Sequence, residues 1–335
     1  MSEILSLCQA YAKYFDIGAA VTPATIVSHG DILKQHFNSL TCENQMKYSV
    51  IHPEEGRYDF SGADAVVAFA KENGMRMRAH APVWHNQTPD WIFKQGDRMA
   101  PRELIYERLE QHIKTVAERY NDAVYCWDVV NEATCDTVDP RHIARYGNEV
   151  YRQTRYLTAC GVEYLEKAYH LMRKYSPFAQ LFYNDYNECD PLKRERIYTL
   201  MKNLLDRGAP LQGFGMQTHY SIYSPDMDEV KRSIETYASL GLRLHITEMD
   251  ISFYKDPSEP EIVPTAELME RQTKVYEQLF ELYRSYSDVI DSVTLWGVAD
   301  DRSWLSSPSR KNWPLLFDEN HEAKPVVSKL IEAAK

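Results

Sequence analysis

The chain of 335 residues is long enough for two average domains, but it is also a normal length for one α/β barrel. Apolar residues make up 44% of the chain, enough for a large core, and the formal net charge is -11 without a long run of Lys or Arg. An acidic chain without a basic stripe argues against nucleic acids and anionic membrane surfaces as partners, whereas a neutral polyhydroxy ligand meets no such repulsion.

The ends of the chain and its cysteines indicate a cytoplasmic protein. Residues 1–20 lack a basic segment followed by a continuous apolar run, and they are typical of a short amphipathic helix. No stretch approaches the roughly 18 uninterrupted apolar residues of a membrane span. The six cysteines are scattered without a CxxC pair, so we expect reduced thiols rather than a metal cluster or a disulfide framework.

Strand-length apolar runs alternate along the chain with longer segments of helical spacing. The expected strands are residues 15–21, 39–44, 76–84, 123–131, 179–185, 212–219, 242–250 and 290–299. The expected helices are a short one at 30–37, then 62–74, 103–120, 160–176, 190–207, 227–240, 264–287 and a last one near 322–334. This alternation predicts βαβ units and a parallel sheet.

Eight strand candidates that close with a C-terminal helix favour a single (β/α)8 TIM barrel over residues 1–335. A doubly wound sheet is the alternative, but it requires a glycine-rich first turn, and GFGMQ at 213–217 is not a GxGxxG motif. Active sites of TIM barrels lie at the C-terminal ends of the strands. Polar and aromatic clusters stand at seven of these ends: TCENQMK, HAPVWHNQ, WDVVNEA, YNDYN, MQTHY, HITEMD and LWGVADD. We therefore expect one polar cleft with aromatic walls.

Glu248 is the strongest candidate for a catalytic carboxylate. Strand alternation places Ile246, Glu248 and Asp250 on one face and Thr247 on the other. Two carboxylates on the inward face are costly to bury unless a partner or a reaction uses them. His219, at the end of the preceding run, is placed to bond Glu248 while Asp250 orients its other nitrogen, which keeps Glu248 ionised as a nucleophile. A Glu-His-Asp network that only links two strands is the structural alternative.

Glu132 follows Asn131 at the end of the fourth run. The amide of Asn131 is suited to bond a sugar hydroxyl, and the neighbouring carboxyl is suited to act as a general acid if its pKa is raised. An ionised Glu248 close by would raise that pKa. From the dipeptide alone, a carboxylate that complements the N-terminus of a helix is the stronger interpretation.

The ordered motifs resemble glycoside hydrolase family 10, the endo-β-1,4-xylanases. WDVVNEA and TEMDI are similar to the acid/base and nucleophile signatures of that family. TCENQMKY, HAPVWHNQTPDW, YNDYN, GFGMQTHY and LWGVADDRSWL match in the same order, and together the blocks run from near residue 38 to near residue 305. So many ordered matches are highly specific.

The resemblance implies a role for each matched position. Glu132 would be the acid/base and Glu248 the nucleophile, with His219 and Asp250 supporting it. The residues expected to contact sugar hydroxyls are Asn131 and Gln217 at the cleavage position, His80 and Lys47 on the glycone sugars, Glu43 and Asn44 one sugar further out, and Gln87 at the distal glycone sugar. The expected aromatic walls are Trp84, Trp296 and Trp304, with Tyr186 on the leaving-group side. Sugar rings present C–H faces to aromatic planes, and their hydroxyls require oriented polar groups.

The implied function is retaining hydrolysis of internal β-1,4-xylosidic bonds through a covalent glycosyl-enzyme, with xylan or xylo-oligosaccharides as substrate. A retaining β-1,4-glucanase is the alternative within enzymes, and a non-catalytic carbohydrate-binding barrel is the alternative outside them. Gln87 and Trp304 are placed to crowd the hydroxymethyl group that distinguishes glucose from xylose. The mechanism implies no cofactor or metal, and His29, His36, His142 and His321 have no metal-binding spacing. The sequence does not specify an oligomeric state.

Two features depart from the family pattern. Family members are often exported, so the missing export signal suggests an intracellular member that processes short, imported xylo-oligosaccharides. Ala81 and Pro82 stand where Thr-Leu is frequent, but His80 and Trp84 remain in place on either side, so we expect little change in the chemistry.

Overall fold

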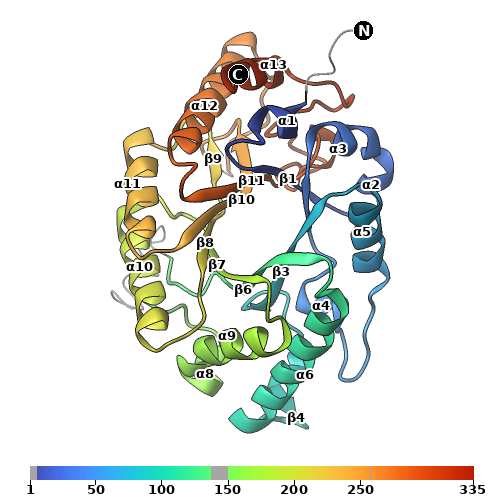
Figure 1. The fold of residues 1–335 in the computed structure, drawn as a ribbon, viewed down its shortest axis with the longest axis vertical. Helices are drawn as coiled ribbons and strands as arrows, with labels where there is room; N and C mark the ends of the chain where they lie inside the picture. Colours follow the sequence, from blue (N-terminus) through green and yellow to red (C-terminus); the bar gives the residue numbers. More distant parts are fainter. Residues whose placement is uncertain (1–5, 137–149, 257) are drawn as a thin grey trace.

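The structure is a computed structural model that describes residues 6–136, 150–256 and 258–335. Within these ranges, eight parallel strands form a closed barrel in the order β11-β1-β2-β3-β6-β7-β8-β10, and β10 pairs with β11 to complete the ring. Helices surround the barrel, as the view down it in Figure 1 shows. The predicted (β/α)8 TIM barrel is confirmed.

The elements follow the predicted alternation closely. The barrel strands are β1 (Asp16–Val21), β2 (Ser39–Cys42), β3 (Arg76–Trp84), β6 (Val124–Asn131), β7 (Gln180–Asp185), β8 (Gly213–Met216), β10 (Arg243–Ser252) and β11 (Ile290–Leu295). Three short strands complete the set: β9 (His219–Ser221) pairs with β10, while β4 (Lys94–Gln95) and β5 (Arg98–Met99) form a separate two-stranded antiparallel sheet. The longer helices are α5 (Ser61–Glu72), α6 (Arg102–Tyr120), α9 (Glu163–Tyr175), α10 (Pro191–Asp206), α11 (Met227–Ala238), α12 (Ala266–Ser285) and α13 (Pro325–Ala333). The shorter ones are α1 (Leu7–Tyr11), α2 (Thr25–Ser28), α3 (Gly30–His36), α4 (Tyr48–Ile51), α8 (Arg155–Cys160), η1 (Asp90–Phe93) and η2 (Asp300–Arg302).

The longer helices form where apolar residues recur at helical spacing, and some of them also have a capping side chain. In α6, Ile105, Leu109, Ile113 and Val116 are buried, and this spacing of three or four residues places them on the face toward the barrel. Helix α10 begins with a proline at its first position, and the Asp190 side chain accepts the N–H of the third residue of the helix. Local sequence and tertiary burial therefore agree on these boundaries.

The structure corrects the sequence prediction at three strands. The run 212–219 is not one strand, because Thr218 adopts a left-handed φ of 62° and separates β8 from β9. The run 290–299 ends as a strand at Leu295. Strand β10 contains an irregularity after Ile246, so Thr247, expected on the face opposite Glu248, contacts the same Asn184 side chain as Glu248 does. All three irregularities lie at the C-terminal end of the barrel.

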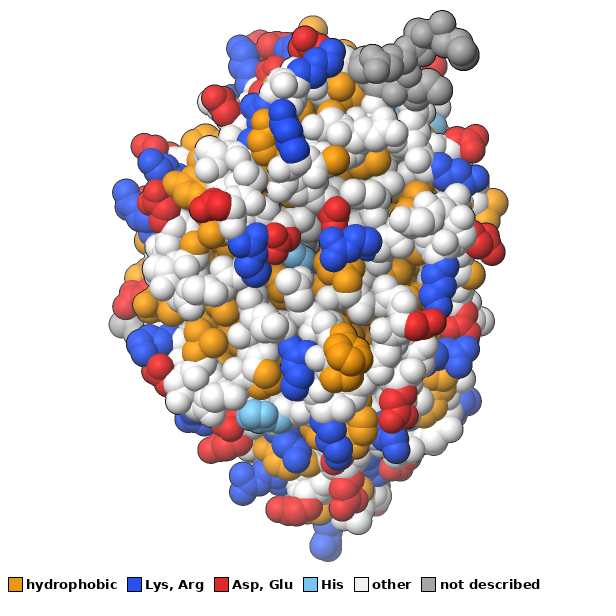
Figure 2. Space-filling model, viewed as in Figure 1, with side chains coloured by type: hydrophobic (Ala, Val, Ile, Leu, Met, Phe, Trp, Pro, Cys, Tyr) orange, Lys and Arg blue, Asp and Glu red, His pale blue; other side chains and the backbone are white. Residues whose placement is uncertain are grey.

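The two ends of the described chain lie close together at the outer edge of the barrel. Helices α1 and α13 are neighbours in Figure 1, and the Tyr11 hydroxyl donates to the Leu330 carbonyl at 3.0 Å. On the face that Figure 2 shows, acidic and basic side chains are interspersed, in agreement with a chain that has no basic stripe. Among the described residues, none of the helices has the length and apolar character needed to cross a bilayer.

Candidate functional site

The predicted site residues meet in one cleft at the C-terminal end of the barrel. The cavity has a volume of about 620 Å³. It is lined by Glu43, Asn44, Lys47, His80, Trp84, Gln87, Asn131, Glu132, Tyr186, Gln217, His219, Glu248, Trp296 and Trp304. Asp250, the remaining predicted residue, lies behind His219 and is buried. His85, Asn86 and Asn187 also line the cavity but were not assigned to the site from the sequence.

The Glu248 carboxylate is held by one amide and one imidazole. Asn184 Nδ2 donates to Glu248 Oε1 at 2.7 Å, and His219 Nε2 lies 3.2 Å from Oε2. The other ring nitrogen of His219 lies 3.0 Å from Asp250, which also accepts the indole N–H of Trp304 at 2.8 Å. The contacts of His219 with Glu248 and Asp250 were predicted from the sequence, whereas those of Asn184 and Trp304 were not.

The network fixes the charges of both groups. Burial alone would raise the pKa of Glu248, but the His219 hydrogen bond, the charges of His80 and His219 and the Asn184 hydrogen bond outweigh it and lower the pKa to about 2. Burial would lower the pKa of His219, but Asp250 and Glu248 hold it well above its ordinary range. At neutral pH Glu248 is therefore an anion and His219 a cation.

Among the residues that the structure describes, the donors to the Glu132 carboxyl group are neutral. Trp84 Nε1 donates to Oε2 at 2.7 Å, while Gln217 Nε2 and Asn131 Nδ2 donate to Oε1 at 3.0 and 3.1 Å. Burial raises the pKa of Glu132, the Gln217 hydrogen bond opposes this in part, and nearby carboxylates including Glu248 raise it further. The predicted direction is confirmed, and burial is the larger cause. Residues 132–136 are not helical, so the interpretation of Glu132 as a helix-terminal carboxylate is wrong.

Asn184 connects the two carboxyl groups and was missed in the sequence. Besides its bond to Glu248, its Nδ2 donates to Asn131 Oδ1 at 2.9 Å, and its Oδ1 accepts the Thr247 hydroxyl at 2.7 Å. Gln217 Nε2 lies 3.2 Å from the same Asn131 oxygen. The YNDYN cluster at the end of β7 signalled this position, but only the register of β7 between its neighbours shows which of its residues points inward.

Polar residues on the other side of the cleft are linked to each other. Lys47 Nζ donates to Asn44 Oδ1 at 3.0 Å, and Asn44 Nδ2 donates to Glu43 Oε1 at 3.2 Å. Burial lowers the pKa of Lys47 while Glu248, Glu43 and Glu132 oppose that shift. Burial raises the pKa of Glu43, opposed by Lys47 and Asn44. These groups present amide, ammonium and carboxyl atoms to a ligand with hydroxyl groups.

His80 is oriented from below by a buried ion pair. Its Nδ1 lies 3.0 Å from Asp128 Oδ2, and Asp128 pairs with Arg78, which is completely buried. The His80 ring lies edge-on to Trp296 with 5.5 Å between ring centroids. His80 and Trp84 are both in the cleft, so the expectation that Ala81-Pro82 leaves them in place is confirmed.

The aromatic residues surround the polar groups on several sides. Lys47 Nζ lies 5.0 Å from the centroid of Trp84 and 5.9 Å from that of Trp296. Trp296 is almost buried, whereas Trp304 is 54% exposed at the rim. Tyr186 is fixed by its hydroxyl, which donates to Asp136 at 2.5 Å and accepts from Arg152 at 2.8 Å. These two partners of Tyr186 were not singled out from the sequence.

The backbone is strained where it forms the cleft. Gln87, Glu132 and Asn187 have φ values of 42°, 55° and 53°, in the left-handed region that non-glycine residues rarely adopt. At Glu132 the strain is supported by hydrogen bonds on both sides of the residue: its N–H donates to the Asn184 carbonyl at 2.8 Å, and its carbonyl accepts Arg152 Nε at 2.9 Å. The turn directs the Glu132 side chain into the cleft instead of along the strand.

A barrel whose cleft holds one carboxyl group with a lowered pKa and one with a raised pKa, between aromatic walls, is the arrangement of a glycoside hydrolase. The nucleophile and the acid differ in charge because their partners differ, and the remaining lining suits a neutral sugar.

Comparisons with known proteins identify the family to which the chain belongs. It matches the Glycosyl hydrolase family 10 sequence model over residues 6–333. It is 46% identical over 336 residues to endo-1,4-beta-xylanase B of Paenibacillus barcinonensis, and the match covers 98% of each chain. It is 45% identical over 338 residues to an endo-1,4-beta-xylanase of Geobacillus stearothermophilus, and this match covers 98% of this chain and 99% of the relative. A crystal structure of the Paenibacillus xylanase with a conduramine derivative superposes with a TM-score of 0.92 at 46% identity and 99% coverage of both chains. The protein belongs to glycosyl hydrolase family 10.

Proposed function

We propose that the protein is a retaining endo-1,4-β-xylanase with Glu248 as nucleophile and Glu132 as acid/base. The observation that carries the proposal is the opposite direction of the two pKa shifts within one cleft. The relatives named above are endo-1,4-beta-xylanases, and a related variant with 45% identity, a TM-score of 0.92 and coverage of 98% of this chain and 99% of its own was crystallised in complex with xylotriose.

The two carboxyl groups act in sequence in a double displacement. Glu132 donates its proton to the glycosidic oxygen while the Glu248 carboxylate attacks the anomeric carbon and forms a glycosyl-enzyme. Loss of the leaving group admits water, and Glu132, now ionised, takes a proton from it as the water attacks the same carbon. Glu248 leaves as a carboxylate, which the His219 cation stabilises. The sugar retains its anomeric configuration because it is inverted twice.

The lining of the cleft supports a xylose-based substrate. Asn131 and Gln217 are buried beside both carboxyl groups and are suited to bond the 2-hydroxyl side of the sugar at the cleavage position. Gln87 and Trp304 both line the cleft, where they are proposed to crowd the hydroxymethyl group that glucose has and xylose lacks. Discrimination by pocket shape is worth only about 1–3 kcal/mol per site, so we expect slow activity on β-1,4-glucan.

We further propose that short xylo-oligosaccharides inside the cell are the natural substrates. No disulfide bond joins the six cysteines, all of which lie in the described ranges, and five of them are buried, which suits a reducing compartment. Fractionation of the source cells tests the location: most activity should appear in the cytosolic fraction, and recovery from the culture medium would overturn this part of the proposal.

Assays on defined oligosaccharides test the enzymatic proposal. Xylotetraose should be shortened to smaller xylo-oligosaccharides, the first product should be the β-anomer by NMR, and Glu248→Ala should abolish turnover. A product that first appears as the α-anomer would refute retention, and wild-type rates in Glu248→Ala would refute the nucleophile. Faster cleavage of cellotetraose than of xylotetraose would show a glucanase instead. Equal or higher efficiency on polymeric xylan than on xylotetraose would refute the preference for oligosaccharides.

A further inference from the structure

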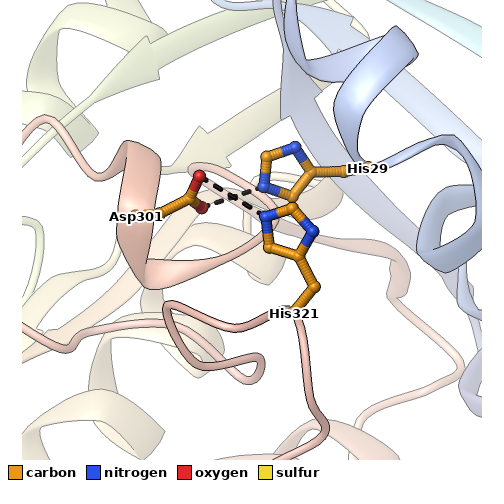
Figure 3. A group of neighbouring side chains, drawn as sticks. All are labelled: His29, Asp301 and His321. Atoms are coloured by element: carbon orange, nitrogen blue, oxygen red, sulfur yellow. Dashed lines mark hydrogen bonds and ion pairs between the residues drawn. The ribbon is translucent and has the colours of Figure 1, made fainter.

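Two histidines and an aspartate from distant parts of the chain meet outside the sugar cleft. His29 lies between α2 and α3, Asp301 in η2, and His321 in the loop before α13 (Figure 3). His29 Nε2 lies 2.9 Å from Asp301 Oδ1, and His321 Nε2 lies 3.4 Å from Asp301 Oδ2. One donor atom of each residue lies within 4.8 Å of the others. Sequence spacing gave no indication of this group, while His142, considered with them, lies outside the described residues.

The spacing of these atoms fits a tetrahedral metal ion. Zinc bonds of about 2.0–2.1 Å place neighbouring ligand atoms roughly 3.3 Å apart. His29 Nε2 and His321 Nε2 lie 2.9 and 3.4 Å from different oxygens of the Asp301 carboxylate, both close to that spacing. The two histidine rings are tilted by 38° with centroids 4.0 Å apart. Small side-chain adjustments are enough to admit the ion.

The surroundings orient the two histidines. The side chain of His29 is buried, and its second nitrogen, Nδ1, lies 2.7 Å from the Ser28 hydroxyl, the kind of outer partner that metal-binding histidines use. His321 has a φ of 67°, in a turn that Asp318 closes by accepting the N–H groups of Asn320 and Glu322. The Asp301 and His321 side chains are 28% and 34% exposed, which leaves a path for the ion and room for a water ligand.

We infer that His29, Asp301 and His321 form a binding site for a zinc-like divalent transition metal, with water completing the coordination. Two imidazoles and one carboxylate favour zinc, cobalt or nickel over calcium and magnesium, which prefer oxygen ligands. The acidic segment DENHE at 318–322 and the formal net charge of -11 favour a cation here. The inference is independent of the reaction proposed above.

The bound ion would tie three loops of the barrel to each other. Asp301 also lines a second cavity of about 720 Å³, which shares Glu43 and Trp304 with the sugar cleft. A metal on Asp301 would therefore stabilise the segment that carries Trp304, together with the region before α13. The site acts as a structural clamp and contributes nothing to bond cleavage.

Calorimetric titration of metal-free protein with ZnCl₂ tests the site. We expect one zinc ion per chain, and loss of this binding in His321→Ala and in Asp301→Asn. Asp301→Asn has nearly the same shape, so it separates the loss of a ligand from a loss of folding. His170→Ala is the matched control, because His170 also faces a carboxylate, Glu166 at 3.6 Å, but belongs to no group of three candidate ligands within the described ranges. This control should bind zinc as the wild type does.

Thermal unfolding gives a second measurement. With zinc at one hundred times its dissociation constant, the melting temperature of a chain of 335 residues should rise by about 4 °C. Both ligand variants should lose this rise, and calcium should not produce it. The inference is overturned if wild-type protein binds no zinc, if either ligand variant binds zinc as tightly as the wild type, or if calcium stabilises the protein equally.

Discussion

Replacing His219 with glutamine should move the acidic limit of activity upward. The change removes the cation but keeps an amide N–H that can reach Glu248. With His219 present, the pKa of Glu248 is about 2 instead of its ordinary 4.5, a difference worth about 3 kcal/mol in favour of the carboxylate. Glu132 shows what neutral donors achieve in the same cleft: it accepts three of them, and its pKa is still raised by burial. We therefore expect the pKa of Glu248 in the variant to rise from about 2, while the charge of His80 and the Asn184 hydrogen bond continue to oppose part of the effect of burial.

The sign of the effect follows from the role of Glu248 as an anion. A nucleophile with a pKa near 2 stays ionised throughout the usable range, so it does not limit wild-type activity at mildly acidic pH. In His219→Gln, kcat/KM should fall as the pH drops through the raised pKa, and the loss relative to wild type should be greater at about pH 5 than at about pH 7. Initial rates of aryl β-xylobioside hydrolysis over a range of acidic pH values measure this fall in kcat/KM.

His170→Gln is the control for this experiment, because His170 is an exposed histidine on α9 whose carboxylate partner is not part of the cleft. Its pH profile should overlay that of the wild type. If the acidic limb of His219→Gln also overlays that of the wild type, the His219 charge does not hold Glu248 ionised and the reasoning is refuted.

Three further substitutions test other parts of the site. Glu132→Gln should slow hydrolysis of unactivated xylo-oligosaccharides by about 10²- to 10⁴-fold but spare the first step with a good aryl leaving group; steady-state and burst kinetics measure this, and equal losses on both substrates would contradict the role as acid. Asn184→Ala should lower the free energy of unfolding by about 1–3 kcal/mol, because Glu248 loses a donor at 2.7 Å. For the same reason the variant should lose activity at a higher pH than the wild type on the acidic side. Urea titration measures the stability, and an unchanged midpoint would contradict the expectation. Arg78→Met should cost about 3–5 kcal/mol because it leaves Asp128 buried without its cation; denaturant unfolding that shows wild-type stability would contradict it.

The barrel and the nucleophile side of the site were predictable because local patterns determine them. Strand-length runs alternate with helices, and in a barrel the C-terminal ends of all strands meet at one rim. His219 was predicted to bond both Glu248 and Asp250 because it stands at the end of the run that precedes theirs, and both bonds are present. The pairing of β10 with β9 aligns Asp250 with His219, so the neighbour relation alone was sufficient.

The features that the sequence did not predict depend on strand register and on contacts between distant segments of the chain. Alternation failed within β10, where an irregularity lets Thr247 and Glu248 contact the same Asn184. A strand irregularity leaves no clear mark in a single sequence. His29 and Asp301 are 272 residues apart and share no motif, so only the closure of the barrel shows that they meet.

The two carboxyl groups have different roles, nucleophile and acid/base, because the charges of their hydrogen-bond partners differ. Both are surrounded by protein, and burial by itself raises the pKa of each, so burial cannot separate an acid from a nucleophile. The number of hydrogen bonds cannot separate them either, since Glu132 accepts three and Glu248 is the one that stays ionised. What differs is that Glu248 faces His219, a cation held by Asp250, whereas Glu132 faces indole and amide donors. Asp250 therefore acts at a distance: by keeping His219 protonated it keeps Glu248 unprotonated, and this leaves Glu132 as the group that carries the proton.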